Sequence, residues 1–175
     1  MRKFLNGLYS VSLYASGALI VLICLLVSAQ VFLNVATRFL PFDLPPSIPS
    51  YAEISGFMLA AASFCALGPT LKSGQHIQIT LLTQHLAEKF APIQKIAVYV
   101  IGFGFALYAL YFVSGLVFES WEFGDKSFGS VKIDLWIPQS AMVLGLGVLA
   151  IALADELIGA IAQLFQNVDG ETFND

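Results

Sequence analysis

Residues 11–35 read VSLYASGALIVLICLLVSAQVFLNV, a stretch of 25 residues with no charged side chain. A helix crosses the hydrocarbon core of a bilayer with about 20 consecutive apolar residues. This stretch is long enough to cross, and it therefore predicts a first transmembrane helix.

Three further apolar stretches of similar length follow, at about residues 51–71, 92–118 and 135–154. The break before the second contains four prolines, which do not allow a continuous helix: Pro41, Pro45, Pro46 and Pro49. Trp136 opens the last stretch, as expected at a membrane interface, where tryptophan is enriched. We therefore predict an all-α integral membrane protein, with four transmembrane helices in one domain that covers residues 1–175.

The composition supports this fold class. Hydrophobic residues make up 58% of the chain and charged residues only 11%, too few to keep the surface of a soluble domain wet. The net charge of -4 disfavours a nucleic-acid partner, which requires a basic surface.

The segment at about residues 76–91 is too polar to cross the bilayer. Its apolar residues recur at helical spacing, and include Ile79, Leu82, Leu86 and Phe90. We predict an interfacial amphipathic helix here. Beyond Asp155 and Glu156, which we expect to end the fourth span, the chain is predicted to continue as an amphipathic surface helix.

The two ends of the chain bear on topology. Arg2, Lys3 and the later Val27-Ser28-Ala29 imitate a secretory signal with its cleavage site, but the apolar run continues past that site, so we expect an uncleaved anchor. Five Lys or Arg residues lie on the side of the N-terminus, the central loop and the C-terminus, against three on the other side. The positive-inside rule then predicts both termini in the cytoplasm.

The sequence offers no catalytic, cofactor or metal site. Its ionisable residues cluster at predicted helix ends or in loops, whereas a protein that itself moves ions places such groups inside the membrane. His76 and His85 lie in the interfacial segment, where facing haem ligands are not expected. A membrane enzyme would need an active site in the charged loop at residues 119–134, where no base and nucleophile can be paired.

Small residues form three stripes that permit close helix packing: Gly56, Ala60 and Ser63; Gly102, Ala106 and Ala109; Gly147, Ala150 and Ala154. Each stripe is expected either to pack within the chain or to contact another protein. Near the membrane edge, Arg38 ends the first span and Glu53 opens the second. These two charges are expected either to pair or to be solvated independently.

Motifs spread over most of the chain resemble those of one family: Gln30-Val31, Arg38-Phe39, Glu53-Ile54-Ser55, Phe64 with Gly68, Lys72-Ser73-Gly74-Gln75-His76-Ile77, and Leu135-Trp136-Ile137-Pro138-Gln139 with Gly145. In this order and spacing the chain is similar to the small integral-membrane subunit of tripartite ATP-independent periplasmic (TRAP) transporters. Lys72 stands where arginine is common in that family.

The resemblance implies a bacterial inner-membrane transporter driven by a sodium gradient, which imports an organic acid such as a sialic acid or a dicarboxylate. Its partners would be a large transmembrane subunit, which carries the substrate, and a periplasmic substrate-binding protein. This chain would enlarge the stationary scaffold. The alternative is a small four-helix structural subunit of another multi-subunit membrane complex. The residues expected to act in structure or subunit contact are Arg38, Glu53, Gly56, Ala60, Gly68, His76, Gly102, Ala106 and Trp136.

Overall fold

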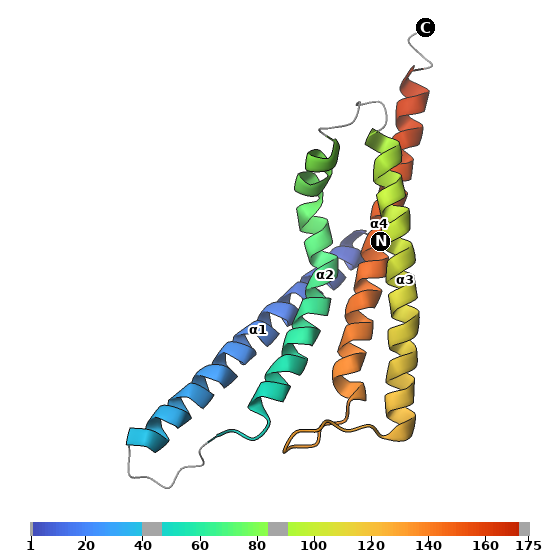
Figure 1. The fold of residues 1–175 in the computed structure, drawn as a ribbon. Helices are drawn as coiled ribbons and strands as arrows, with labels where there is room; N and C mark the ends of the chain where they lie inside the picture. Colours follow the sequence, from blue (N-terminus) through green and yellow to red (C-terminus); the bar gives the residue numbers. More distant parts are fainter. Residues whose placement is uncertain (1, 40–46, 84–90, 172–175) are drawn as a thin grey trace.

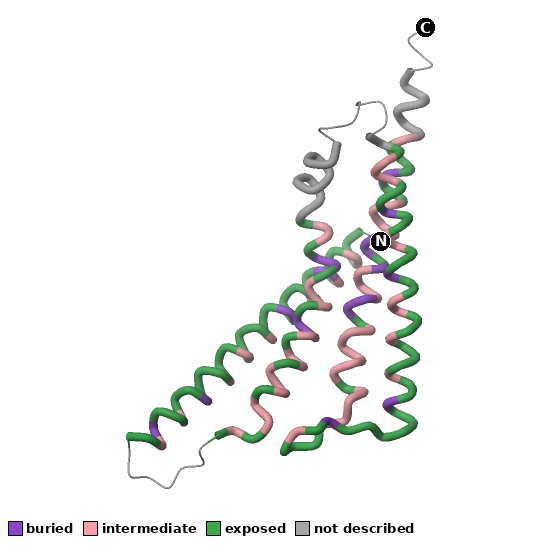
Figure 2. The backbone as a smooth tube through the Cα atoms, in the orientation of Figure 1, coloured by how far each residue is buried: buried purple, intermediate pink, exposed green. Residues whose placement is uncertain are grey.

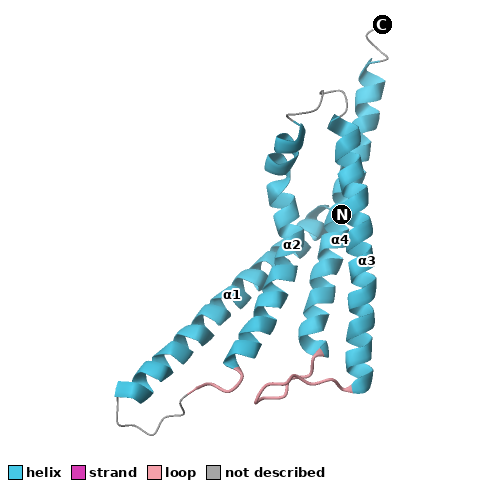
Figure 3. Ribbon diagram, in the orientation of Figure 1, coloured by secondary structure: helices cyan, strands magenta, loops and turns pink. Residues whose placement is uncertain are grey.

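Four long helices make up most of the part of the chain that the structure describes. The computed structural model describes residues 2–39, 47–83 and 91–171, with their side chains except at residues 4, 74–83, 91–92 and 165–171. The helices are α1 (Arg2–Phe39), α2 (Tyr51–Thr83), α3 (Ala91–Phe123) and α4 (Trp136–Glu171) (Figures 1 and 3). Each contains a segment long and apolar enough to cross a membrane: Leu5–Phe39, Tyr51–Ser73, Ile93–Phe123 and Trp136–Leu164. This confirms the all-α prediction with four candidate membrane spans.

The predicted interfacial helix is not a separate element in the part of the chain that the structure describes. Residues 76–83 continue α2, and residues 84–90 lie outside the described residues. The prediction was wrong because a polar segment is no reason for a helix to end. No proline follows Pro69 before Thr83, and Gly74 costs an exposed helix only about 1 kcal/mol. In the same way, the surface helix predicted after Glu156 is a direct continuation of α4.

The helices form an open arrangement rather than a closed bundle. α2 and α4 run side by side in the same direction, α1 packs chiefly on α2, and α3 packs chiefly on α4 (Figure 1). Buried residues are few (Figure 2). Many lie along these seams, and others lie elsewhere, such as Gln30 on α1, Ser120 near the end of α3 and Ser127 in the loop that follows. We call this arrangement the open layer. Most of the apolar surface of each span consequently faces outward.

The seam between α2 and α4 is close because glycines lie in it. A Cβ atom at Gly145 would stand 2.5 Å from the carbonyl carbon and oxygen of Phe64, and one at Gly68 would stand 2.7 Å from Cγ1 of Val148. Real Cβ atoms do not approach so closely, so a larger residue at either position would force the two helices apart.

Polar contacts join α1 to α2. The hydroxyls of Ser12 and Ser16 donate to the carbonyl oxygens of Cys65 (2.6 Å) and Ala62 (2.8 Å). The buried Gln30 side chain accepts a hydrogen bond of 2.7 Å from the backbone N–H of Ile48, in the linker before α2. Hydrogen bonds between helices stabilise association in lipid, where packing gains no hydrophobic driving force.

The end of α3 is set by Gly124, which adopts φ of +65°. The N–H of Asp125 donates to the carbonyl of Ser120 at 3.1 Å, a pattern that closes a helix with a left-handed residue. The chain then forms a tight loop at residues 124–135, which we call the 124–135 hairpin. Backbone hydrogen bonds close it from Ser127 to Ile133 (2.8 Å) and from Leu135 to Asp125 (3.0 Å).

Candidate functional site

A polar cluster joins the helices near one end of the layer. Lys72 on α2 forms ion pairs with Asp155 and Glu156 on α4, and its Nζ lies 2.9 Å from Oε1 of Glu156. The same Nζ stands 5.5 Å from the ring centroid of the buried Tyr9 on α1, within cation–π range. We call Lys72, Asp155, Glu156 and Tyr9 the Lys72 cluster. It ties three helices together at one level.

The remaining helix reaches the same level through Tyr99. This α3 residue is buried in a hydrophobic cluster with Leu153, and Leu71 and Leu157 pack against that cluster. Those leucines flank Lys72 and Glu156 in sequence. All four helices therefore meet at the depth of the Lys72 cluster.

The opposite end of the layer is marked by tryptophans. The rings of Trp121, at the end of α3, and Trp136, at the start of α4, meet edge to face with centroids 4.8 Å apart. At about 1.5 Å per residue, the helix stretches over residues 51–72, 99–121 and 136–155 each rise by about 30 Å. This equals the thickness of a hydrocarbon core, about 30 Å. The Lys72 cluster and the Trp121–Trp136 pair thus lie one bilayer core apart.

The charge of the Lys72 cluster is uneven. One ammonium faces two carboxylates, and between 14% and 33% of each of these three side chains is exposed. Such partly exposed, hydrogen-bonded charges contribute about 1–3 kcal/mol when paired and cost a similar amount when one partner is removed. The cluster therefore stabilises the contact between the helices, and it carries one more carboxylate than ammonium group.

Arg38 and Glu53 are not paired. The three ion pairs among the described residues involve Lys72 and Lys126, and Arg38 is exposed in the last turn of α1. Glu53 instead faces the 124–135 hairpin. Its carboxylate lies so close to Gly129 that a Cβ atom on this residue would collide with it. The proline-containing linker does not bring the two charges together.

The small-residue stripes divide into inner and outer ones. Ala106 is buried in the seam between α3 and α4, and the Gly102 position faces Leu153. Ala60 is half-buried, whereas Gly56 is exposed with nothing near the position of a Cβ atom. Gly102 and Ala106 of the stripe on α3 therefore pack within the chain, as does Ala150 on α4. Nothing lies near the Cβ positions of Gly56 on α2 and Gly147 on α4, so these two positions can face another protein.

This division predicts the effect of enlarging Gly102. Because a Cβ atom there would lie 3.5 Å from Cδ2 of Leu153, we expect Gly102→Ala to be tolerated and Gly102→Leu to destabilise the isolated chain by about 1–3 kcal/mol. Gly104→Leu is the matched control, since nothing lies within 4 Å of that position. Unfolding in mixed micelles measures both. Equal stability of the two leucine variants would contradict the placement of Gly102.

The other predicted residues have distinct positions. Gly68 lies in the seam between α2 and α4, and the ring of Trp136 meets that of Trp121 edge to face. The side chain of His76 lies outside the described residues. Sequence reasoning missed the Lys72 cluster, although the signal was present: the predicted topology places the end of the second span and the end of the fourth on the same side of the membrane.

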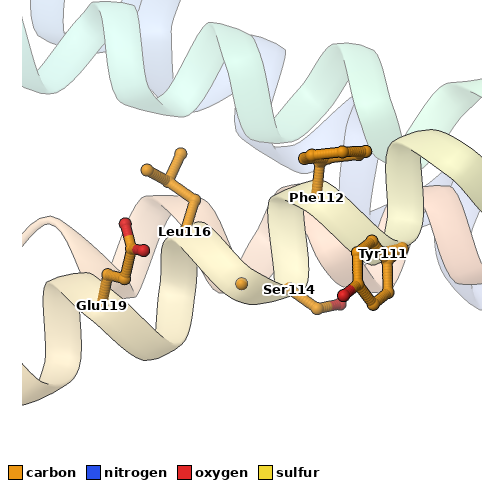
Figure 4. Close-up of a pocket in the computed structure, with 6 residues that line it drawn as sticks. Tyr111, Phe112, Ser114, Leu116 and Glu119 are labelled. Atoms are coloured by element: carbon orange, nitrogen blue, oxygen red, sulfur yellow. The ribbon is translucent and has the colours of Figure 1, made fainter.

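An open hollow lies on the outer side of α3 and is lined by that helix alone (Figure 4), through Tyr111, Phe112, Ser114, Gly115, Leu116 and Glu119. Within the described part of the chain, no group of three or more His, Cys, Asp or Glu residues is placed to hold a metal ion.

Comparison with known proteins gives one match. The family model described as tripartite ATP-independent periplasmic transporters, DctQ component, matches residues 27–163. No curated protein and no solved structure matches the chain. The matched segment covers most of the sequence, from the second half of α1 to the C-terminal half of α4, and includes Lys72, Asp155 and Glu156.

Proposed function

The chain belongs to the DctQ family, the small membrane component of TRAP transporters, and from this premise we propose that it is a stationary scaffold that binds neither substrate nor coupling ion. The family consists of transporter subunits, not enzymes. A tripartite transporter has further components, which we propose are a large transmembrane subunit and a periplasmic substrate-binding protein. The transported compound is proposed to be an organic acid, such as a sialic acid or a dicarboxylate, taken up with sodium.

One observation carries the scaffold proposal: the middle of these helix stretches contains no charged residue that could bind an organic anion. In the helix stretches that rise across the core, the charged residues are Glu53 and Glu119 near the hairpin end and Lys72 and Asp155 at the other end. An organic anion stripped of water costs several kcal/mol unless a cation or helix end receives it. The cation of the Lys72 cluster is not spare either, because Lys72 is already paired with two carboxylates.

The open layer supports the same proposal. In the most apolar part of each candidate span, only 6–28% of the residues are buried within the chain. Most of the helix surface is therefore left for lipid or another protein. A helix layer of this kind can extend the footprint of a partner in the membrane without enclosing a transport path. We propose that the large subunit packs against one of its outer surfaces.

Binding measurements on the isolated, folded chain test the scaffold role. Calorimetry with candidate organic acids and sodium is expected to give no saturable heat, whereas the periplasmic receptor binds the acid. Deleting the chain is expected to abolish uptake by cells that still make the other components. Saturable binding by the isolated chain at micromolar concentration would overturn the proposal.

The orientation is a separate proposal. We propose that both termini and the Lys72 cluster lie on the cytoplasmic side of a bacterial inner membrane, and the five-to-three excess of Lys and Arg supports this orientation. A fluorescent protein fused after Gln84 is then expected to fluoresce, and a phosphatase fused after Asp125 is expected to be active in the periplasm. The reverse pattern would show that the chain is inserted the other way round.

A further inference from the structure

Phe128 stands out on the 124–135 hairpin because its side chain is fully exposed. Val131, three residues on, is also exposed, at 44%. The neighbours of these two residues are polar or charged, and their charges cancel, since Asp125 and Asp134 match Lys126 and Lys132. An exposed phenylalanine at a loop tip is unfavourable in water and calls for an apolar contact outside the chain.

The hairpin that carries Phe128 is held rigidly. The hydroxyl of Ser127 accepts from the N–H of Ile133 (3.1 Å) and donates to the carbonyl of Val131 (3.2 Å). The hydroxyl of Ser50, the residue before α2, accepts from the N–H of Val131 at 2.9 Å. Gly129 is packed against Ser50 and Glu53 with no room for a Cβ atom. The position of Phe128 is therefore fixed relative to the helix ends.

The depth of the hairpin follows from the helices that it joins. It leaves α3 just after Trp121, enters α4 at Trp136 and is bonded to the residue before α2, so it lies at one boundary of the core of about 30 Å. Figure 1 shows it running across the ends of α2 and α4 rather than away from them. Other large aromatic residues are exposed at this same end: Phe39, Trp121 and Phe123.

We propose that the 124–135 hairpin is a membrane anchor that inserts Phe128 into the boundary between lipid headgroups and acyl chains. Aromatic side chains are enriched at this depth, and Lys126 and Lys132 can reach headgroup phosphates while the ring enters the apolar layer. A lipid contact fits better than a protein contact because Phe128 continues an exposed belt of aromatics that is already at interface depth. The anchor fixes the depth of α3 and α4 beside whatever partner they hold, and it does not depend on the scaffold proposal.

Fluorescence of a single tryptophan tests the anchor. Phe128→Trp is combined with Trp121→Phe and Trp136→Phe, and the purified chain is reconstituted in vesicles that contain phosphatidylcholine brominated near the top of the acyl chain. We expect bromine to quench this tryptophan as strongly as it quenches Trp121 in a variant that retains only Trp121. A soluble tryptophan amide added to the same vesicles is the aqueous reference.

Two results would overturn the proposal. The first is emission at the wavelength of the soluble amide, with quenching by acrylamide but not by bromine. The second is shielding of the tryptophan only after a protein partner is added, which would make the hairpin a protein-docking surface. If loss of the Trp121–Trp136 pair prevents folding, Phe128→Cys in a Cys24→Ala, Cys65→Ala background can carry a nitroxide. That label is expected to collide with oxygen more often than with a water-soluble nickel complex, and the reverse ratio contradicts insertion.

Discussion

Replacing Gly145 with leucine is expected to abolish recovery of the folded chain. The first side-chain atom alone would stand 2.5 Å from the backbone of Phe64, and backbone cannot turn aside as a side chain can. The seam between α2 and α4 would have to open along its length, which we expect to cost about 3 kcal/mol or more. The measurement is the folded, monodisperse fraction after extraction, followed by unfolding in mixed micelles.

Gly147→Leu is the control for this prediction. It lies two residues away on the same helix and adds the same side chain, but nothing lies within 4 Å of its Cβ position. The isolated chain is expected to keep its stability within about 0.5 kcal/mol. If Gly145→Leu folded as well as Gly147→Leu, the close approach of α2 and α4 would be refuted.

Reversing the charge of Lys72 is expected to have the second-largest effect. Lys72→Glu would place three carboxylates together at the edge of the hydrocarbon core and remove the cation above Tyr9. Removing one partner of a fully buried pair costs 3–5 kcal/mol, and because about a third of the Lys72 side chain is exposed, we expect about 2–3 kcal/mol. Unfolding of the isolated chain in mixed micelles measures this loss.

Two further variants separate pairing from general charge effects. Lys126→Glu breaks the exposed pair with Asp134, in which the two charged atoms are 3.9 Å apart, and is expected to cost less than about 1 kcal/mol. The double variant Lys72→Glu with Asp155→Lys is expected to regain part of the stability that Lys72→Glu loses. If the double variant lost as much stability as the single variants Lys72→Glu and Asp155→Lys lose together, the two side chains would not interact.

The number of helices and their class could be predicted from the sequence because hydropathy reports them directly. Four predominantly apolar stretches each match the thickness of a bilayer, and the structure has a helix over each one. The ends of the helices could not be predicted in the same way. Apolar content marks the part of a helix that lies in lipid. The backbone hydrogen bonds of a helix can continue beyond that part. Both α2 and α4 accordingly extend well past their apolar segments.

Contacts between helices were predictable only where topology brings their ends together. The spacing of small residues predicted close packing at Gly147, which faces open space, and did not include Gly145, which faces the backbone of Phe64. That distinction depends on the rotation of each helix about its axis. Arg38 and Glu53 were near in topology, yet Arg38 is exposed and Glu53 faces the 124–135 hairpin, because nearness along the chain does not set the direction of a side chain.

The open layer also affects the amount of this protein that accumulates in a cell. A chain with so little interior gains much of its stability from whatever covers its outer surfaces, and a bound partner stabilises the folded state by mass action. Copies made in excess of that partner have a larger unfolded population, which proteases remove. The steady-state abundance of this chain is therefore expected to follow the supply of its partner rather than its own rate of synthesis.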